Sequence, residues 1–151
     1  LHTNSAIATI ARLFDLGLKP YVVATALEGI IAQRLVRQVC PLCREEVAID
    51  TQLRARLGSV FANVSQVYRG KGCPSCHGSG YKGRVGLYEV LTLDDDLRDR
   101  IGSGASILEI RRTVRQKGLR SIAQHALERV EAGATSPEEI LRVLGPQAGE
   151  E

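Results

Sequence analysis

The N-terminal segment of the chain has the pattern of an amphipathic helix. Its apolar residues recur at the spacing of one helix face, at Ile7, Ile10, Ala11 and Phe14. Thr3 and Asn4 precede this run and are residue types that cap helices, and Gly17 follows it as a stop. The pattern predicts a first helix that Thr3 or Asn4 caps and that ends before Gly17.

A second helix is predicted to begin at Pro20, because proline suits the first helical position. Apolar residues between Tyr21 and Ala32 fall on more than one face of such a helix, so we expect it to be buried on several sides. Residues Gln33 to Val39 then alternate between polar and apolar positions. This alternation predicts a short strand that runs into Cys40.

The middle of the chain contains few periodic segments. Between Cys40 and Lys82 we expect one short helix after Asp50 and one short strand over Gln66 to Tyr68. The next segment, residues 84–93, is rich in strand-forming residues. It predicts a strand that ends at Asp94, a residue suited to cap the following helix.

Helical patterns fill the rest of the chain. Ser106 with Glu109, and Ser136 with Glu139, have the spacing of capping boxes, in which two side chains satisfy each other's backbone N–H groups. The matching helix stops are Gly118, Gly133 and Gly145. His125 falls on the polar face of its helix, so we expect it to be solvated.

Composition narrows the class of protein. The chain has 151 residues, 44% of them hydrophobic, and can therefore bury a core. It starts at Leu1 and contains no methionine, as expected of a piece of a longer protein. Charges interrupt every apolar run before membrane-spanning length, so we expect a cytoplasmic chain. The formal net charge of +3 is spread along the sequence, which gives no support for direct nucleic-acid binding.

The four cysteines carry the most specific chemical signal. They form two C-P-x-C pairs, Cys40 with Cys43 and Cys73 with Cys76, on either side of residues 44–72. Two residues between cysteines allow both sulfur atoms to face one metal ion, and two such pairs complete a tetrahedral site. A closed site of this kind leaves no position for substrate, so the sequence predicts structural zinc. Four nearby cations are expected to offset its negative charge: Arg37, Arg44, Lys71 and Lys82.

Disulfides, free buried thiols and a redox C-x-x-C site are the alternatives for these cysteines. A cytoplasmic chain disfavours disulfides, and the βαβ pattern of thioredoxin-like redox sites is missing around the pairs. His77 follows the last cysteine and is expected to be a solvated neighbour. Residues Cys73 to Gly80 also resemble one repeat of the zinc domain of DnaJ-type chaperones, a family that uses four repeats where this chain has one.

Three further segments resemble the ATPases of type II secretion and type IV pilus assembly. Residues 1–4, with the sequence L-H-T-N, resemble the end of the family's histidine box. Residues 32–37 resemble the A-Q-R-L-V-R segment before its tetracysteine motif, and residues 80–91 are similar to its G-Y-x-G-R-x-G-x-x-E-x-L stretch. The segments occur in the family's order, so the resemblance extends over essentially the whole chain.

The resemblance implies a hexameric cytoplasmic motor that uses ATP and magnesium and acts on a platform protein of the inner membrane. The resemblance implies that this motor contacts the inner membrane only through its partner proteins. The implied fold is α/β: the C-terminal part of a RecA-like P-loop ATPase domain, with an inserted tetracysteine zinc module and a helical C-terminal subdomain. This chain contains no G-x-x-x-x-G-K-[ST] loop for phosphate, so the fragment alone is expected to be inactive as an ATPase.

The resemblance also implies candidate residues at the nucleotide site. His2 matches the histidine of the histidine box, which in the family lies near the terminal phosphate and helps to report the nucleotide state. A lone histidine in this position would otherwise be a structural residue. Arg34 and Arg37 are candidates for facing nucleotide or a neighbouring subunit. The alternative for both arginines is a structural role, in which their positive charge offsets the negative charge of the nearby thiolates.

The expected domains follow the order of these segments. Residues 1–39 form the end of the ATPase core, with the histidine-box remnant, the buried helix and an edge strand. Residues 40–82 form the zinc insertion, residues 83–93 return to the core as a strand, and residues 94–151 form the helical subdomain. Related retraction motors lack the tetracysteine module, which implies that zinc closes a long loop and presents its tip, residues 51–68, to a partner.

A stand-alone zinc-ribbon adaptor that binds protein or nucleic acid is the alternative function. Ribbons that bind nucleic acid have a basic surface with interleaved aromatic residues. This chain has mixed charge and only 4% aromatic residues, which favours the motor family.

Overall fold

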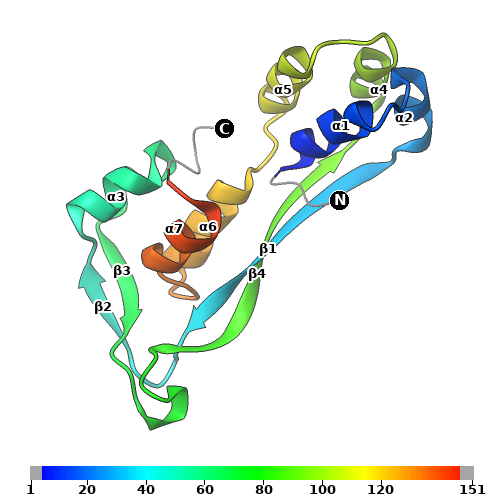
Figure 1. Cartoon of the computed structure of the whole chain (residues 1–151). Coiled ribbons are helices and arrows are strands. Elements are labelled where there is room, and N and C mark those ends of the chain that lie inside the picture. The colour runs from blue at the N-terminus through cyan, green and yellow to red at the C-terminus, as the bar shows by residue number, and fades with distance from the viewer. Residues whose placement is uncertain (1–4, 147–151) are drawn as a thin grey trace. The chain divides into compact units, whose positions relative to one another are not determined.

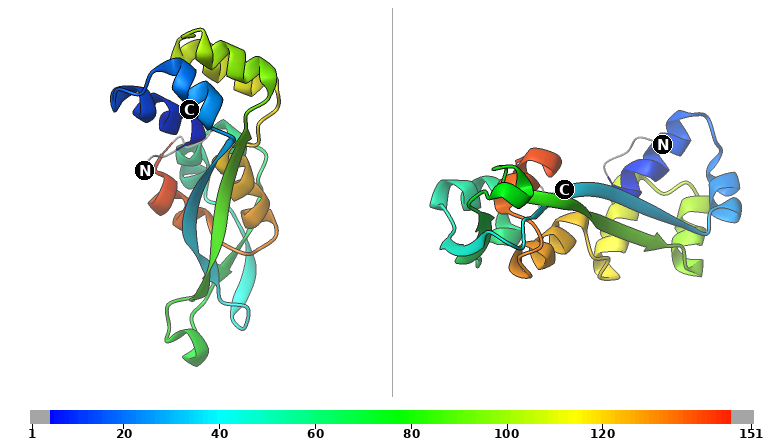
Figure 2. Two further views of the ribbon diagram at one scale, coloured as in Figure 1. Left: turned by 90° about the vertical axis from the view of Figure 1, so that its right-hand side faces the viewer. Right: turned by 90° about the horizontal axis from the view of Figure 1, so that it is seen from below.

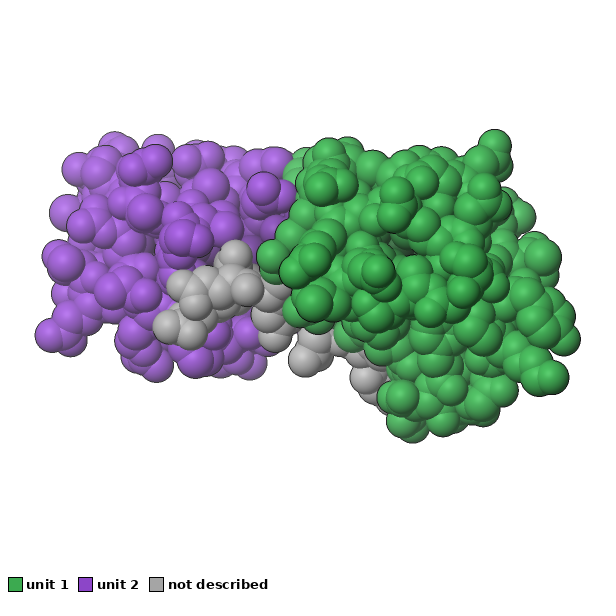
Figure 3. All heavy atoms as spheres, turned by 90° about the horizontal axis from the view of Figure 1, so that it is seen from above, with its two compact units in different colours: residues 1–32, 88–120 green, residues 33–87, 121–151 purple. Residues whose placement is uncertain are grey.

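The computed structural model describes residues 5–146, so His2 and the two predicted caps Thr3 and Asn4 lie outside the described residues. The chain has a mixed α/β fold that divides into two compact units (Figure 3). Unit 1 comprises residues 1–32 and 88–120, and unit 2 comprises residues 33–87 and 121–151. The helices after Asp94 are shared between the two units, and the expected domain boundaries stay a prediction.

Two long strands, β1 (Gly29–Val39) and β4 (Tyr81–Thr92), pair with each other and contribute residues to both units. The N–H of Leu93 donates to the carbonyl of Glu28 before β1, and the N–H of Cys40 after β1 donates to the carbonyl of Gly80. Residue numbers therefore rise along one strand as they fall along the other, which makes the pair antiparallel. The two strands lie side by side in every view of Figures 1 and 2.

The predicted long second helix is wrong beyond Ala26. Helix α2 (Pro20–Ala26) ends there, and Ile30 and Ile31 already belong to β1. Ile30 is 8% exposed and Ile31 is 69% exposed, which is the alternation of a strand with one buried face. The apolar run looked like a helix buried on several sides because its first half is helical and its second half alternates.

Four helices and the adjoining strand segments form unit 1. The helices are α1 (Ala6–Asp15), α2, α4 (Asp95–Gly102) and α5 (Ile107–Gln116). Their apolar faces share one core, whose members include Ile10, Val23, Leu91, Leu97, Ile101 and Ile110. Within residues 5–146, no helix combines the length and the apolar character that crossing a bilayer requires.

Most of the predicted helix caps in unit 1 are confirmed. Asp94 caps α4, and Ser106 forms the predicted capping box with Glu109 at the start of α5. The cap of α1 is different from either residue predicted, because the Oγ of Ser5 accepts from the N–H of Ala8 at 3.2 Å. Serine is as good a cap as threonine or asparagine, so neighbouring candidates in the sequence could not be told apart.

Unit 2 contains the segment between the cysteine pairs and the last two helices. Its elements are β2 (Arg44–Ala48), α3 (Thr51–Leu57), the 3-10 turns η1 (Ser59–Phe61) and η2 (Pro74–Cys76), β3 (Gln66–Gly70), α6 (Ile122–Glu131) and α7 (Pro137–Leu144). The helix after Asp50 and the strand at Gln66 were predicted. Strand β2 was not, and it pairs antiparallel with β3 so that Arg44 lies opposite Gly70.

The segment between the cysteine pairs packs on the C-terminal helices. Leu57 and Phe61 are fully buried and belong to the same hydrophobic core as Ile122 and Ile140, from α6 and α7. The expectation that zinc presents residues 51–68 to a partner stays a prediction, and their buried apolar side chains, such as Leu57 and Phe61, cannot form such a contact. Those side chains stabilise their own unit instead.

His125 is buried, against the prediction of a solvated position. Its Nε2 accepts a hydrogen bond from the Nε of Arg129 at 3.2 Å. Helix α6 contacts β3, η1 and α7, so more than one of its faces is covered and its polar face does not meet bulk water at His125.

A buried carboxylate, Glu139, joins β1 to α7. The predicted capping box is only half formed, because Ser136 accepts from the N–H of Glu139 at 3.3 Å while the carboxylate turns toward two arginines. Its oxygens accept from the backbone N–H and the guanidinium of Arg37, at 2.8 to 2.9 Å, and from the guanidinium of Arg142 at 2.6 and 2.8 Å. Burial alone would raise the pKa of Glu139, but these hydrogen bonds outweigh it and lower the pKa to about 2.

The loop between α6 and α7 adds two backbone links to the same end of β1. The N–H of Val39 donates to the carbonyl of Ala134 at 3.0 Å, and the hydroxyl of Thr135 donates to the carbonyl of Arg37 at 2.8 Å. The last residues of β1 before Cys40 are therefore fixed against the C-terminal helices.

Replacement of Glu139 by glutamine should destabilise unit 2 by about 2 kcal/mol, because both arginines lose the ionised acceptor that they share. The two guanidiniums are about half exposed, so water recovers part of the loss. The matched control is Glu131→Gln, which removes the same charge from an exposed position on α6. Urea unfolding followed by circular dichroism measures both variants, and equal midpoints would contradict the role given to Glu139.

A comparison of the unmodified chain with E139Q also gives a pH test. The pKa of Glu139 is lowered from 4.5, so its ionised form stabilises the fold above about pH 4.5, and that contribution is lost as the pH falls toward 2. The difference in stability between the unmodified chain and E139Q should therefore shrink over this range. Effects of acid on the cysteines are common to both proteins and cancel in the difference.

Candidate metal centre

The structure brings the four cysteine sulfur atoms together in unit 2, with every pair of sulfur atoms within 4.8 Å. Cys40 follows β1 and Cys43 precedes β2, while Cys73 and Cys76 lie between β3 and β4. The Sγ distances are 3.9 Å from Cys40 to Cys73, 3.9 Å from Cys43 to Cys76, and 3.8 Å from Cys73 to Cys76. The pairs that are far apart in sequence thus form one cluster.

These distances fit a tetrahedral metal site. Zinc–sulfur bonds of about 2.3 Å place the sulfur atoms of a regular tetrahedron about 3.8 Å apart. A disulfide would instead need a sulfur–sulfur distance of about 2.05 Å, and all four residues are free cysteines. The donor set and its spacing therefore fit a closed four-thiolate centre, with His77 exposed and outside the ligand group.

Backbone N–H groups point at the sulfur atoms, as a thiolate site requires. The Sγ of Cys76 accepts from the N–H of Cys73 at 3.2 Å and from the N–H of Gly80 at 3.3 Å. Burial raises the pKa of Cys76, but these N–H groups and the neighbouring thiols outweigh it and lower the pKa to about 6. Burial dominates at Cys43, where the neighbouring thiols add to it and the pKa is raised to about 12 despite the N–H of Gly72.

Backbone hydrogen bonds also join the two cysteine pairs. The N–H of Cys40 donates to the carbonyl of Gly80 at 2.9 Å, and the N–H of Lys71 donates to the carbonyl of Cys43 at 3.0 Å. Gly70 and Gly80 approach so closely that a Cβ on Gly70 would lie 2.1 Å from the carbonyl oxygen of Gly80. Glycine is therefore needed at this crossing for the second pair to reach the first.

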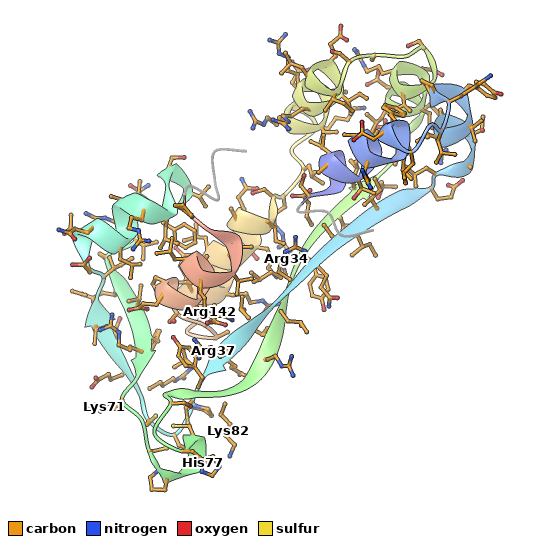
Figure 4. The ribbon with its side chains drawn as sticks, viewed as in Figure 1. Arg34, Arg37, Lys71, His77, Lys82 and Arg142 are labelled. Carbon is orange, nitrogen blue, oxygen red and sulfur yellow. The ribbon has the colours of Figure 1, made fainter. Side chains whose placement is uncertain are left out.

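The four cations expected to offset the thiolates have other partners. Arg37 binds Glu139 and lies over the ring of Tyr81, and Arg44 lies over the ring of Tyr68. Lys71 pairs with Glu45 at 2.8 Å, and Lys82 donates to the hydroxyl of Ser75 at 2.7 Å. Figure 4 shows Lys71, Lys82 and His77 around the end of the unit that carries the cysteines, with Arg37 nearer to α7.

Of the three residues considered for the nucleotide site, the structure describes Arg34 and Arg37. His2 lies outside the described residues. Arg34, on β1, donates from Nη1 to the carbonyl of its neighbour Gln33 at 2.9 Å. A role for either residue at a nucleotide site stays a prediction.

Sequence reasoning missed a second buried carboxylate, Glu89 on β4. Its Oε1 accepts from the N–H of Ala6, the first residue of α1, at 2.7 Å. A carboxylate at a helix N-terminus interacts favourably with the helix dipole. The sequence does contain a signal for this residue, because Glu89 is the glutamate of the G-x-x-E pattern within residues 80–91. This pattern was used only for the family resemblance.

Comparison with known proteins identifies the family. A family model described as "Type II/IV secretion system protein" matches residues 1–142. The chain is 41% identical over 143 residues to the type IV pilus assembly ATPase PilB of Thermus thermophilus, covering 93% of this chain and 16% of that protein. It is 42% identical over 143 residues to the type II secretion system protein E of Dickeya dadantii, covering 95% of this chain and 28% of that protein.

A third relative gives the same result. The type II secretion system ATPase E of Vibrio cholerae is 39% identical over 143 residues, covering 95% of this chain and 28% of that protein. The chain thus spans less than a third of the length of each of these relatives. Because the family model matches nearly the whole chain, this chain belongs to the type II/IV secretion system protein family.

Proposed function

We propose that this chain is the C-terminal part of a motor ATPase that powers type II secretion or type IV pilus assembly. The observation that carries the proposal is its identity of about 40%, over more than nine-tenths of the chain, with two proteins named as a type IV pilus assembly ATPase and a type II secretion system ATPase. The proposed parent is a cytoplasmic homo-hexamer with a RecA-like domain. It binds ATP and magnesium, and it acts on a platform protein of the inner membrane without direct contact with nucleic acid.

In this proposal Cys40, Cys43, Cys73 and Cys76 hold one structural zinc ion. Their Sγ distances of 3.8 to 3.9 Å support it, as does the closed set of four sulfur donors. Bound zinc would neutralise part of the thiolate charge and hold the two cysteine pairs together.

The role proposed for zinc is to stabilise unit 2. Cys40 follows directly on the end of β1 that Thr135, Ala134 and Glu139 attach to the C-terminal helices. The segment between the cysteine pairs supplies Phe61 and Leu57 to the core that those helices share. Zinc would therefore close the long loop from Cys43 to Cys73 and fix its core residues against α6 and α7.

In this proposal, residues outside this chain carry most of the nucleotide chemistry of the parent protein. Two residues of this chain also contribute to it. His2 is proposed to report the nucleotide state, and Arg34 to face nucleotide or a neighbouring subunit. Both proposals follow from family membership and from the positions of the two residues in the matching segments.

The purified chain should contain about one zinc ion, measured by elemental analysis, and should release it as four thiols react with a thiol-blocking reagent. The double variant C40S/C43S should lose the metal and more than about 3 kcal/mol of unfolding free energy, because the loop is no longer closed. Ser75→Ala, between the second pair of cysteines, is the control that keeps all four sulfurs. Zinc-free protein whose thiols react independently would contradict the site.

A chimera tests the proposed motor function. The segment of the Dickeya dadantii relative that matches this chain is exchanged for this chain, and ATP hydrolysis and secretion by the relative's own system are measured. We expect the chimera to hydrolyse ATP while the isolated 151-residue chain does not. A folded, zinc-loaded chimera without ATPase activity, or hydrolysis by the isolated chain, would contradict the proposal.

A further inference from the structure

Unit 2 contains an open pocket of about 520 Å³ at the junction of β1, β4 and α7. Three arginines line it, Arg37 from β1, Arg84 from β4 and Arg142 from α7, together with Leu35 and Tyr81. Figure 4 shows Arg37 and Arg142 close to each other beside β1 and α7. The only acidic side chain among the residues that line this pocket is Glu139, so the lining carries an excess of positive charge.

The arginines retain donors for a ligand. Arg37 and Arg142 both use Nε and Nη2 to bind Glu139, and these contacts leave the two N–H groups of each Nη1. The side chains of Arg37 and Arg142 are 46% and 58% exposed, whereas Glu139 is fully buried beneath them. The pocket surface therefore presents guanidinium groups, and the carboxylate that orients two of them is hidden.

Arg84 is exposed, and no hydrogen bond or ion pair holds its guanidinium within residues 5–146. The other two arginines have fixed positions, because each is bound to Glu139 and Arg37 also lies 4.2 Å from the centroid of the Tyr81 ring. A ligand would thus meet the preorganised guanidiniums of Arg37 and Arg142, and the guanidinium of Arg84 could move to bind it as well. Preorganisation lowers the entropic cost of binding.

The chemistry of the pocket favours carboxylates over phosphate. Phosphate sites at helix N-termini use several free backbone N–H groups, but at α7 the N–H of Glu139 is bonded to Ser136 and Pro137 has none, which leaves at most that of Glu138 in the first turn. Leu35, 49% exposed, lies among the arginines and offers an apolar contact to the flanking residues of a peptide. Guanidinium groups bind carboxylates and phosphates alike with paired hydrogen bonds, so the apolar contact at Leu35 is the feature that favours a peptide carboxylate.

We propose that this three-arginine pocket is a docking site for an acidic segment of a partner protein, whose carboxylates bind Arg37, Arg84 and Arg142 while an aliphatic side chain packs on Leu35. None of the four cysteines is among the residues that line this site, and the site gives Arg37 a protein ligand in place of the nucleotide or subunit contact considered for it from the sequence. It gives unit 2 a charged surface for protein contact at the junction of β1, β4 and α7.

The test uses the zinc-loaded 151-residue chain and an end-blocked hexapeptide of leucine and glutamate, titrated by nuclear magnetic resonance of the backbone and arginine Nε–H groups. We expect shifts at Arg37, Arg84 and Arg142, and weaker binding as salt is raised. Arg84→Gln should weaken binding by about fivefold or more, because it removes a charged donor without disturbing the Glu139 contacts. Arg56→Gln, an exposed arginine on α3 outside the pocket, is the matched control and should leave binding unchanged.

Four outcomes would overturn the proposal. The first is no shift of the pocket resonances with the acidic peptide. The second is equal binding of the peptide in which glutamine replaces glutamate. The third is an equal loss of affinity in R84Q and R56Q, which would show non-specific attraction. The fourth is tighter binding of inorganic phosphate at the same residues, which would identify the pocket as a phosphate site.

Discussion

The convergence of four sulfur atoms from two distant chain segments is the constraint on which unit 2 depends. Thiolates packed within 4.8 Å of one another repel, so the cluster is stable in its ionised form only around a cation. The two pairs flank a long segment, and joining them removes most of the freedom that this segment would have as an open loop. The close crossing of Gly70 and Gly80 shows how tightly the backbone is folded to allow it.

A second constraint acts at the adjoining end of β1. Glu139 on α7 accepts from the backbone and side chain of Arg37, and the loop before α7 bonds to Arg37 and Val39. The cysteine cluster begins at the next residue, Cys40. The segment between the cysteine pairs then returns to the same helices, because Phe61 and Leu57 pack in the core that α6 and α7 share. The cluster, the end of β1 and these two helices are therefore linked to one another by packing and hydrogen bonds. The proposed zinc is therefore better explained as part of a folding unit than as the base of a projecting loop.

The chemistry of this protein was more predictable from sequence than its packing. The C-P-x-C spacing predicted the cluster because local geometry fixes where two sulfurs point. Asp94 and Ser106 were predicted as caps for the same reason: a cap depends on residues within one turn. Ile30 and Ile31 were misassigned because a short apolar run fits helix and strand alike until its partner strand is known. The contacts of Glu139 with Arg37, and the burial of His125 on a helix that β3 and η1 contact, depend on residues far away in sequence, and no local pattern contains that information.

X-ray absorption at the zinc edge of the purified chain tests the central claim most directly, because it reports the ligands of the metal and their distances. The account predicts four sulfur ligands at about 2.3 Å and no nitrogen or oxygen in the first coordination sphere. A zinc ion bound by nitrogen or oxygen in place of any of the four sulfurs would contradict it. So would a folded chain that binds no zinc, because the fold of unit 2 would then not depend on the cysteine cluster.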